Sequence, residues 1–225
     1  MLIYLSGEGK RDVGGLADRD YGDPMDEGFF QPLLRRLVDG PVEFCGVASS
    51  LSLGPEPPRS LTGKLEQRAH QAVALADLEN CDLVVIHTDA DEKAAGKKVP
   101  KKYESRRAQV QKGIDAAGSD RPPAVPAVPI ATTEAWALAD PEAVKARRAH
   151  TKHGNDLRKA PETLWGAPHD PTSNHPKMLL ERVLGHAASH GEQAAIAAAM
   201  DLDVARKRCP LSLEPFIAEV LAAIG

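Results

Sequence analysis

The 225-residue sequence predicts an α/β fold: a mostly parallel sheet of about four strands, with helices on both faces and a helical C-terminal cap. The clearest observation is the run Leu83–Ile86, which is apolar without interruption, as in a strand that is covered on both faces. The second is that further strand-like runs alternate with segments of helical periodicity. The third is that residues 175–224 carry helical patterns and no strand pattern.

The first half of the chain alternates strand and helix patterns. Residues 2–6 are apolar and predict the first strand, and a Gly- and Asp-rich loop is expected over 13–28. Apolar residues recur at helical spacing over 26–38 and again over 61–78, so we expect a helix in each segment. Residues 42–48 lie between these helices and predict the second strand. The central apolar strand follows directly.

The second half of the chain begins with a helix that we expect over 101–117. A fourth strand is expected over 124–131, and because prolines interrupt it, it should be short or lie at an edge of the sheet. Thr133 is then expected to cap a short helix. The remaining pattern predicts helices over 176–184 and over 192–224.

Composition and charge limit the class of protein. The formal net charge of −4 excludes a generally basic nucleic-acid binder but leaves room for a local basic track. No stretch reaches the roughly 18–20 apolar residues of a membrane helix, and the first residues show no signal-peptide pattern. Cys45, Cys81 and Cys209 are widely spaced and odd in number, which favours a reducing, cytoplasmic setting. At this length we expect an α/β domain over 1–145 and a helical extension over 146–225 that packs on it.

Acidic side chains follow the predicted strands. Asp89 and Asp91 come after the central strand, and residues two apart in extended chain point to the same side, roughly 6.6 Å apart. Glu8 follows the first strand and Glu134 the fourth, and because the strand ends of an open parallel sheet share one edge, these carboxylates are expected to converge there. Such a cluster needs a cation, and Mg²⁺ (or Mn²⁺) suits oxygen ligands. The alternative is a solvated, Asp-rich turn that only ends the strand.

A strongly basic run follows the aspartates. Because it comes directly after a predicted metal site, it is a candidate track for a nucleic-acid backbone. The alternative is a solvated loop and helix start. Lys177, at the beginning of a later helix, is a candidate phosphate ligand. The cations of the basic run are Lys97, Lys98, Lys101, Lys102, Arg106 and Arg107.

These motifs together resemble the Toprim domain superfamily, the catalytic fold of topoisomerases, primases and overcoming-lysogenisation-defect nucleases. The resemblance rests on the Glu-Gly-x-x-Asp motif at 8–12 and on the Asp-Ala-Asp motif at 89–91. The Glu-Ala-Trp-Ala-Leu-Ala-Asp segment at 134–140 and the Pro-Lys pair at 176–177 are similar to a compact Toprim-like family of unknown function. The resemblance implies a Toprim/Rossmann-like sheet, an acid/base role for the Glu, and Mg²⁺ binding by the Asp pair.

On this basis we expect a Mg²⁺-dependent nuclease that hydrolyses phosphodiester bonds. Glu8, Asp89 and Asp91 would hold the metal, and Glu8 would also serve as acid or base. Glu134 and Lys177 would complete the catalytic site. By analogy with the resembling family, an ATPase partner and a role in phage defence are expected. Two alternatives stay open: a non-catalytic interaction or effector subunit, and a phosphohydrolase or phosphotransferase that acts on small phosphorylated substrates.

Overall fold

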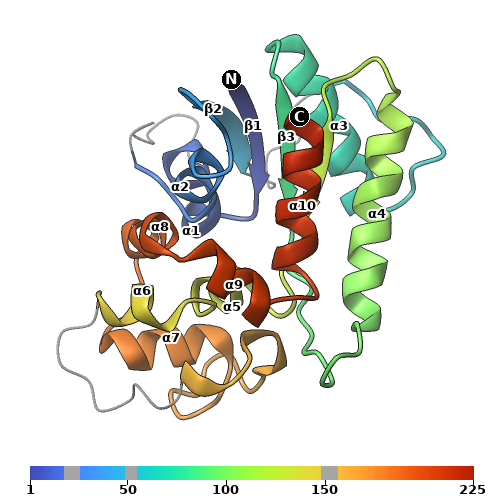
Figure 1. The fold of residues 1–225 in the computed structure, drawn as a ribbon. Helices are drawn as coiled ribbons and strands as arrows, with labels where there is room; N and C mark the ends of the chain where they lie inside the picture. The colour runs from blue at the N-terminus through green and yellow to red at the C-terminus, as the bar shows by residue number, and fades with distance from the viewer. Residues whose placement is uncertain (18–25, 49–54, 148–156) are drawn as a thin grey trace.

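The computed structural model describes residues 1–17, 26–48, 55–147 and 157–225. The middle of the loop expected over 13–28 therefore lies outside the described residues. In the described part, the centre is a four-stranded parallel sheet in the order β2-β1-β3-β4 (Figure 1). The predicted α/β class and sheet are confirmed. The strands are β1 (Leu2–Gly7), β2 (Glu43–Ala48), β3 (Leu83–His87) and β4 (Ala124–Ala127).

The register of the sheet brings the carboxyl ends of β1 and β3 side by side. Ser6 of β1 lies opposite Ile86 of β3, so the chain leaves both strands at the same edge. Open α/β sheets bind ligands at this edge. Residues that follow β1 and residues that follow β3 are therefore close neighbours, although about 80 positions separate them in the chain.

β4 is an edge strand, as its prolines predicted. The N–H of Thr88 donates to the carbonyl of Ala127 at 3.1 Å, so the peptide groups of Ala127 face β3. Successive residues of a strand face opposite ways, so the nitrogen of Pro126 is on the outer side, where no N–H is needed. The strand ends before residue 131 because Pro129 has no N–H to continue the ladder.

Helices connect the strands and form most of the C-terminal part of the chain. They are α1 (Lys10–Val13), η1 (Gly14–Ala17), α2 (Phe30–Arg35), α3 (Lys64–Leu78), α4 (Lys101–Ala117), α5 (Thr133–Ala137), α6 (Pro141–Lys145), η3 (Pro161–Thr163), α7 (Pro176–Leu184), α8 (His190–Ala199), α9 (Leu202–Arg208) and α10 (Leu213–Ile224). Within the described ranges, none of them has the length and apolar character needed to cross a membrane.

The expected helix bounds are met best where apolar spacing and end signals agree. α4 and α7 occupy the predicted residues. α3 begins three residues later than expected: Gly63 is its N-cap, and the N–H of Gly63 donates to Glu66 Oε2 at 3.3 Å. The N-cap of α5 is Thr132 rather than Thr133, which is the first helical residue, so the predicted capping role of Thr133 is wrong. The hydroxyl of Thr133 makes other contacts, described below.

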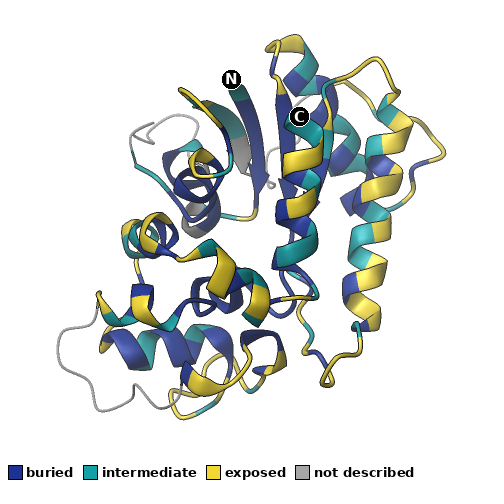
Figure 2. Cartoon of the chain, in the orientation of Figure 1, coloured by how far each residue is buried: buried dark blue, intermediate teal, exposed yellow. Residues whose placement is uncertain are grey.

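Both faces of the sheet are covered because its side chains alternate. Tyr4, Val84 and Ile86 point to one face and pack against α3 and α4. Ile3 and Val85 point to the other face and share a core with α2 and the C-terminal helices. Figure 2 shows the buried residues concentrated in the strands and on the inward sides of the helices. This two-sided burial is what the uninterrupted apolar run of β3 predicted.

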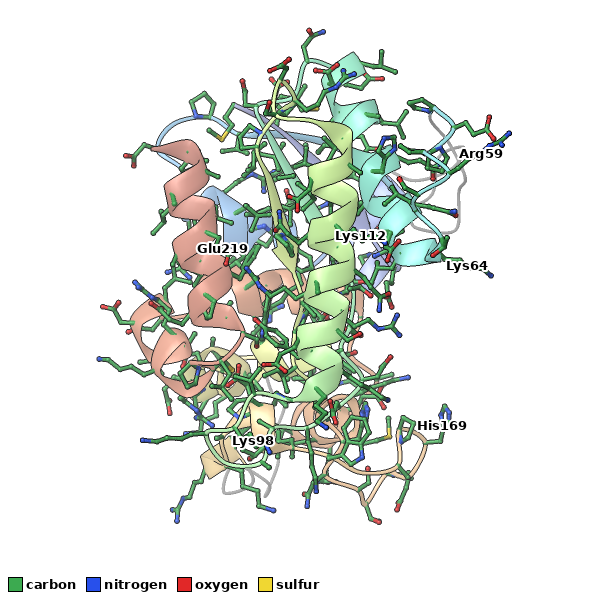
Figure 3. The ribbon with its side chains drawn as sticks, turned by 90° about the vertical axis from the view of Figure 1, so that its right-hand side faces the viewer. Arg59, Lys64, Lys98, Lys112, His169 and Glu219 are labelled. Carbon is green, nitrogen blue, oxygen red and sulfur yellow. The ribbon has the colours of Figure 1, made fainter. Side chains whose placement is uncertain are left out.

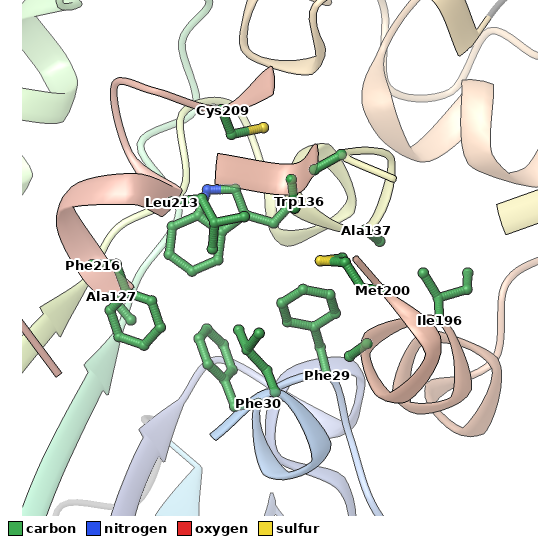
Figure 4. Packing of buried hydrophobic residues seen from close by; sticks show 14 of the residues in the cluster. Phe29, Phe30, Ala127, Trp136, Ala137, Ile196, Met200, Cys209, Leu213 and Phe216 are labelled. Atoms are coloured by element: carbon green, nitrogen blue, oxygen red, sulfur yellow. The ribbon is translucent and has the colours of Figure 1, made fainter. Parts of the chain in front are cut away.

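An aromatic cluster joins the C-terminal helices to the sheet domain (Figure 4). Trp136 stacks on Phe216 of α10 with ring centroids 5.2 Å apart, and Phe30 of α2 lies 6.1 Å from each of them. The indole Nε1 of Trp136 donates to Ser212 Oγ at 2.8 Å. Trp136 is fully buried, so it belongs to the core. The C-terminal helices thus pack on the sheet and complete its hydrophobic core.

α3 and α4 are in close contact at Gly113. A Cβ built on Gly113 would fall well inside contact distance of the Glu66 carbonyl oxygen and 2.7 Å from the Ala69 side chain. Both neighbours belong to α3, and one of them is backbone, so neither can move aside without shifting the helix. The absence of a side chain at this position therefore sets the distance between the two helices.

We expect Gly113→Ala to lower the free energy of unfolding by about 1–3 kcal/mol, although alanine is the better helix former, because overpacking outweighs propensity here. The matched control is Gly191→Ala in α8, where a Cβ meets nothing within 4 Å. That substitution should raise the free energy of unfolding by up to about 1 kcal/mol. Chemical denaturation of both variants checks this, and equal stabilisation by the two would contradict the described α3–α4 contact.

Candidate functional site

A cavity of about 360 Å³ opens at the carboxyl edge of the sheet. Its lining combines the residues after β1 and β3 with the beginnings of α5 and α7. The residues that carry chemistry there are Glu8, Asp12, Asp89, Thr133, Glu134 and Lys177. Of the five residues predicted for the catalytic site, all except Asp91 therefore line one cavity. We call it the carboxylate cavity.

Glu8 reaches the carboxylate cavity directly after β1. Thr88, which follows β3, donates its hydroxyl to Glu8 Oε1 at 2.8 Å. Arg68 of α3 lies close by and donates to the carbonyl of His87. Burial lowers the pKa of Arg68, and the negative charge of Glu8 raises it. Thr88 therefore orients the carboxylate of Glu8. Because Glu8 is exposed, this carboxylate can still reach solvent or a ligand.

His87, the last residue of β3, is buried between two carboxylates. Its Nε2 lies 3.1 Å from Asp89 Oδ1, and its Nδ1 lies 3.4 Å from Asp12 Oδ2, the latter at ion-pair distance but without hydrogen-bond alignment. The ring of Phe30 covers it, with centroids 5.0 Å apart. His87 is 1 % exposed, so both aspartates are paired with a group that is sealed from water.

Thr133 closes this arrangement from the start of α5. Its hydroxyl donates to Asp12 Oδ1 at 2.9 Å, and its backbone N–H donates to Asp89 Oδ1 at 3.0 Å. The N–H of Gly9 donates to the other oxygen of Asp12 at 3.2 Å. Asp12, His87, Asp89 and Thr133 therefore form one connected unit, which we call the His87 network. It fixes the segment after β1, the end of β3 and the start of α5 to one another.

The pKa values of the His87 network follow from burial and charge. Burial alone would lower the pKa of His87, but Asp12 and Asp89 raise it to about 10. Burial would raise the pKa of Asp12, but His87, Thr133 and Gly9 lower it below the usual range. Burial raises the pKa of Asp89, as do the nearby charges of Asp12 and Glu134, against the opposing effect of His87. An ionised Asp12 and a protonated His87 result, and Asp89 is the carboxylate that takes up a proton most readily.

Asp91 does not join Asp89, which corrects the predicted Asp-x-Asp pair. Its side chain is exposed and does not line the carboxylate cavity. The N–H groups of Ala90 and Asp91 both donate to the segment after β4, at 3.0 Å each, which consecutive residues of an extended strand cannot do. Asp91 has a φ of 51°, so the chain turns at this point. The alternation that would align the two side chains ends before Asp91.

Glu134 and Lys177 face the carboxylate cavity from the two helices that follow the sheet. Glu134, in the first turn of α5, is 7 % exposed, and Gln193 Nε2 lies 3.5 Å from its Oε1. Lys177 is in the first turn of α7, where the helix dipole disfavours a cation. Carboxylates across the cavity offset this, and so would an anionic ligand. Burial lowers the pKa of His175, at the N-cap of the same helix, whereas Glu134 and Asp91 raise it.

The basic run does not act as a single track. Arg107 forms an ion pair with Glu219 of α10, which Figure 3 labels, so part of its charge is neutralised within the protein. Its predicted contact with a nucleic-acid backbone stays a prediction. Lys102 donates its Nζ to the carbonyl of Asp91 at 3.2 Å. The remaining members differ in surroundings: Lys98, Lys101 and Lys97 are exposed, and Arg106 is half-buried. Lys97 lines a second cavity.

Sequence reasoning assigned no role to Asp12 or His87, and it missed Arg68. Asp12 was part of the motif at 8–12 without a function. The available signal for His87 was a titratable residue at the last position of an otherwise apolar strand, where burial demands a charged or hydrogen-bonding partner. Arg68 carried no such signal, because its place beside Glu8 depends on how α3 packs.

The carboxylate cavity contains donors of the kind that Mg²⁺ takes. Glu8, Asp89 and Glu134 offer carboxylate oxygens. Burial is the main cause of the raised pKa of Asp89, and the negative charges of Asp12 and Glu134 raise it further. Within the part of the chain that the structure describes, no three His, Cys, Asp or Glu side chains already form a group that could hold a metal ion. The donor set fits the metal in kind.

Comparison with known proteins gives one match. The model of a family described as a domain of unknown function, DUF4276, matches residues 24–220. This range includes Asp89, Glu134 and Lys177 but begins after Glu8 and Asp12. No curated protein and no solved structure matches the chain. The resemblance to Toprim domains stays a prediction.

We expect the imidazole of His87 to remain protonated well above pH 6.5, up to about pH 10, when it is followed by NMR. Because the folded pKa is raised, protonated His87 stabilises the fold fully below pH 6.5, and this contribution is lost as the pH rises toward 10. Asp12→Asn should move the pKa of His87 back toward 6.5, whereas Asp39→Asn, at an exposed position, should not. Titration of His87 near 6.5 in the unsubstituted protein would contradict the described network.

Proposed function

We propose that this chain, which belongs to the DUF4276 family of domains of unknown function, is a Mg²⁺-dependent nuclease that hydrolyses phosphodiester bonds at the carboxylate cavity. One observation carries the proposal. Glu8, Asp89 and Glu134, which are far apart in sequence, line one cavity at the ligand-binding edge of a parallel sheet, together with Lys177. Acidic residues gathered around a cationic side chain suit a metal ion and a phosphate group.

Glu8, Asp89 and Glu134 are the residues that would hold Mg²⁺. When bound, the ion would supply a Lewis acid that polarises the phosphate. Asp91 is not in this set, since it lies off the cavity wall. The His87 network holds Asp89 Oδ1 through Thr133, so the direction of the Asp89 carboxylate is set before any ligand arrives.

Glu8 is the best candidate for general base. It is exposed, its carboxylate is oriented by the hydroxyl of Thr88, and it lines the same cavity as Lys177. A base must be within hydrogen-bond reach of the proton it removes, and an oriented, solvent-reachable carboxylate meets that requirement. Lys177 and the N-terminus of α7 would bind the phosphate being attacked. The exposed Lys98 and Lys101 are proposed to contact the nucleic-acid backbone.

A second candidate is a phosphohydrolase or phosphotransferase that acts on a small phosphorylated molecule. The cavity volume of about 360 Å³ favours it, because pockets of this size enclose small molecules. The same residues would serve both reactions, and only the substrate differs. The predicted ATPase partner, the role in phage defence and the alternative of a non-catalytic effector subunit stay predictions.

We expect Asp89→Asn and Glu8→Gln each to reduce Mg²⁺-dependent cleavage by about a hundredfold or more, because each removes a charge that the reaction needs. The measurement is initial cleavage rate on DNA, RNA and mononucleotides, with and without a chelator. Asp39→Asn makes the same chemical change at an exposed position and should leave the rate unchanged.

Asp91→Asn distinguishes a site defined by the carboxylate cavity, which Asp91 does not line, from a site defined by the Asp-x-Asp motif. If the cavity and not the Asp-x-Asp spacing defines the site, this variant should lose less than about tenfold in rate. A loss equal to that of Asp89→Asn would contradict the proposed donor set. Unchanged cleavage in folded Asp89→Asn and Glu8→Gln would contradict the proposed function as a whole.

A further inference from the structure

A second cavity, of about 290 Å³, is lined by cations from three separate segments of the chain. Lys97 comes from the loop before α4, Arg158 from the segment before η3, and Lys207 and Arg208 from the end of α9. Among the described residues, no ion pair or hydrogen bond to a carboxylate engages Lys97, Arg158 or Lys207. We call it the cationic cavity.

Among the described residues of the lining, Glu162 is the single carboxylate, and it does not neutralise these cations. Glu162 is 2 % exposed, and its oxygens accept hydrogen bonds from the N–H groups of Leu211 and Ser212, at 3.1 and 2.7 Å, and from the Ser212 hydroxyl at 2.6 Å. Its charge is therefore directed at the start of α10 and not at the open space. Cations held around a small cavity repel one another unless an anion enters.

Arg208 is already held in place. Its Nη2 donates to the carbonyls of Leu157 and Lys159, at 2.5 and 2.6 Å. A guanidinium that is fixed by the protein loses little freedom on binding, so it is a pre-organised donor. Its Nε and Nη1 make no hydrogen bond with the rest of the described chain. Each of these two nitrogens can still donate a hydrogen bond to an anion.

A purely structural reason covers only part of the cluster. Lys207 and Arg208 are in the last turn of α9, where the helix dipole favours cations. Lys97 and Arg158 belong to other segments and gain nothing from that dipole. Lys97 is brought here by its loop, in which the N–H of Ala94 donates to the carbonyl of Glu162 at 2.7 Å. The convergence of cations from independent segments thus needs another explanation.

We infer that the cationic cavity is a phosphate-binding site, which takes a phosphate of a nucleic-acid backbone or of a nucleotide. Several cations, one pre-oriented guanidinium and a volume suited to a phosphate with part of its sugar define this chemistry. The site is distinct from the carboxylate cavity, shares no lining residue with it, and does not depend on catalysis. In a nuclease it would bind substrate at a distance from the cleaved bond.

The test is calorimetric titration with pyrophosphate, ATP and a short single-stranded oligonucleotide, at low ionic strength and with a chelator present, so that no metal contributes. The test variant is Lys97→Glu/Lys207→Glu, at two exposed positions. The control is Arg59→Glu/Lys64→Glu, which makes the same change in net charge at exposed positions that Figure 3 places away from the loop of Lys98. Thermal melting confirms that each variant is folded.

The unsubstituted protein and the control should bind at least one probe, and the test variant should bind it at least about tenfold more weakly. Oligonucleotide binding alone assigns the ligand to a nucleic-acid backbone, whereas ATP or pyrophosphate binding alone assigns it to a nucleotide. No binding by the unsubstituted protein, or equal binding by the test variant and the control, would overturn the inference. Asp89→Asn should retain phosphate binding, because Asp89 does not line the cationic cavity. The binding result therefore tests this inference even if the proposed nuclease activity is not found.

Discussion

The placement of a buried histidine between two aspartates is the constraint on which the site depends. His87 ends β3, Asp89 follows that strand and Asp12 lies in α1, and Thr133 ties both carboxylates to α5. Removing one partner from such a group leaves an uncompensated buried charge, which typically costs about 3–5 kcal/mol. The segment after β1 is tied to this network through Asp12, which accepts a hydrogen bond from the N–H of Gly9.

The same network explains why acidic residues can gather at this edge at all. His87 offsets the charge of Asp12 and part of the charge of Asp89, and Arg68 lies close to Glu8. Part of the negative charge of the carboxylates is therefore neutralised by groups within the protein. What remains uncompensated faces the carboxylate cavity, where Lys177 is the cation in the lining. α5 connects this cavity to the cationic one, because it carries Thr133 and Glu134 and also Trp136, whose indole reaches Ser212 and through it Glu162.

The fold was readable from the sequence because local patterns decide it. The apolar run of β3, the spacing in α4 and the prolines of β4 each reflect a property of a single segment. The site was readable only in part. Topology brings together the four residues that follow strand ends or begin helices: Glu8, Asp89, Glu134 and Lys177. The chain turns at Asp91, so Asp91 does not line the cavity with them.

Other features depend on packing that no single segment reveals. The pairing of Arg107 with Glu219 and the meeting of Lys97 with Arg158 and Lys207 follow from how distant segments of the chain pack together.

The outer side of β4 lacks one hydrogen-bond donor because Pro126 has no N–H, and this has a consequence for association. An incoming strand from a second molecule would find no N–H at Pro126, so this border of the sheet resists the edge-to-edge growth by which proteins polymerise into aggregates.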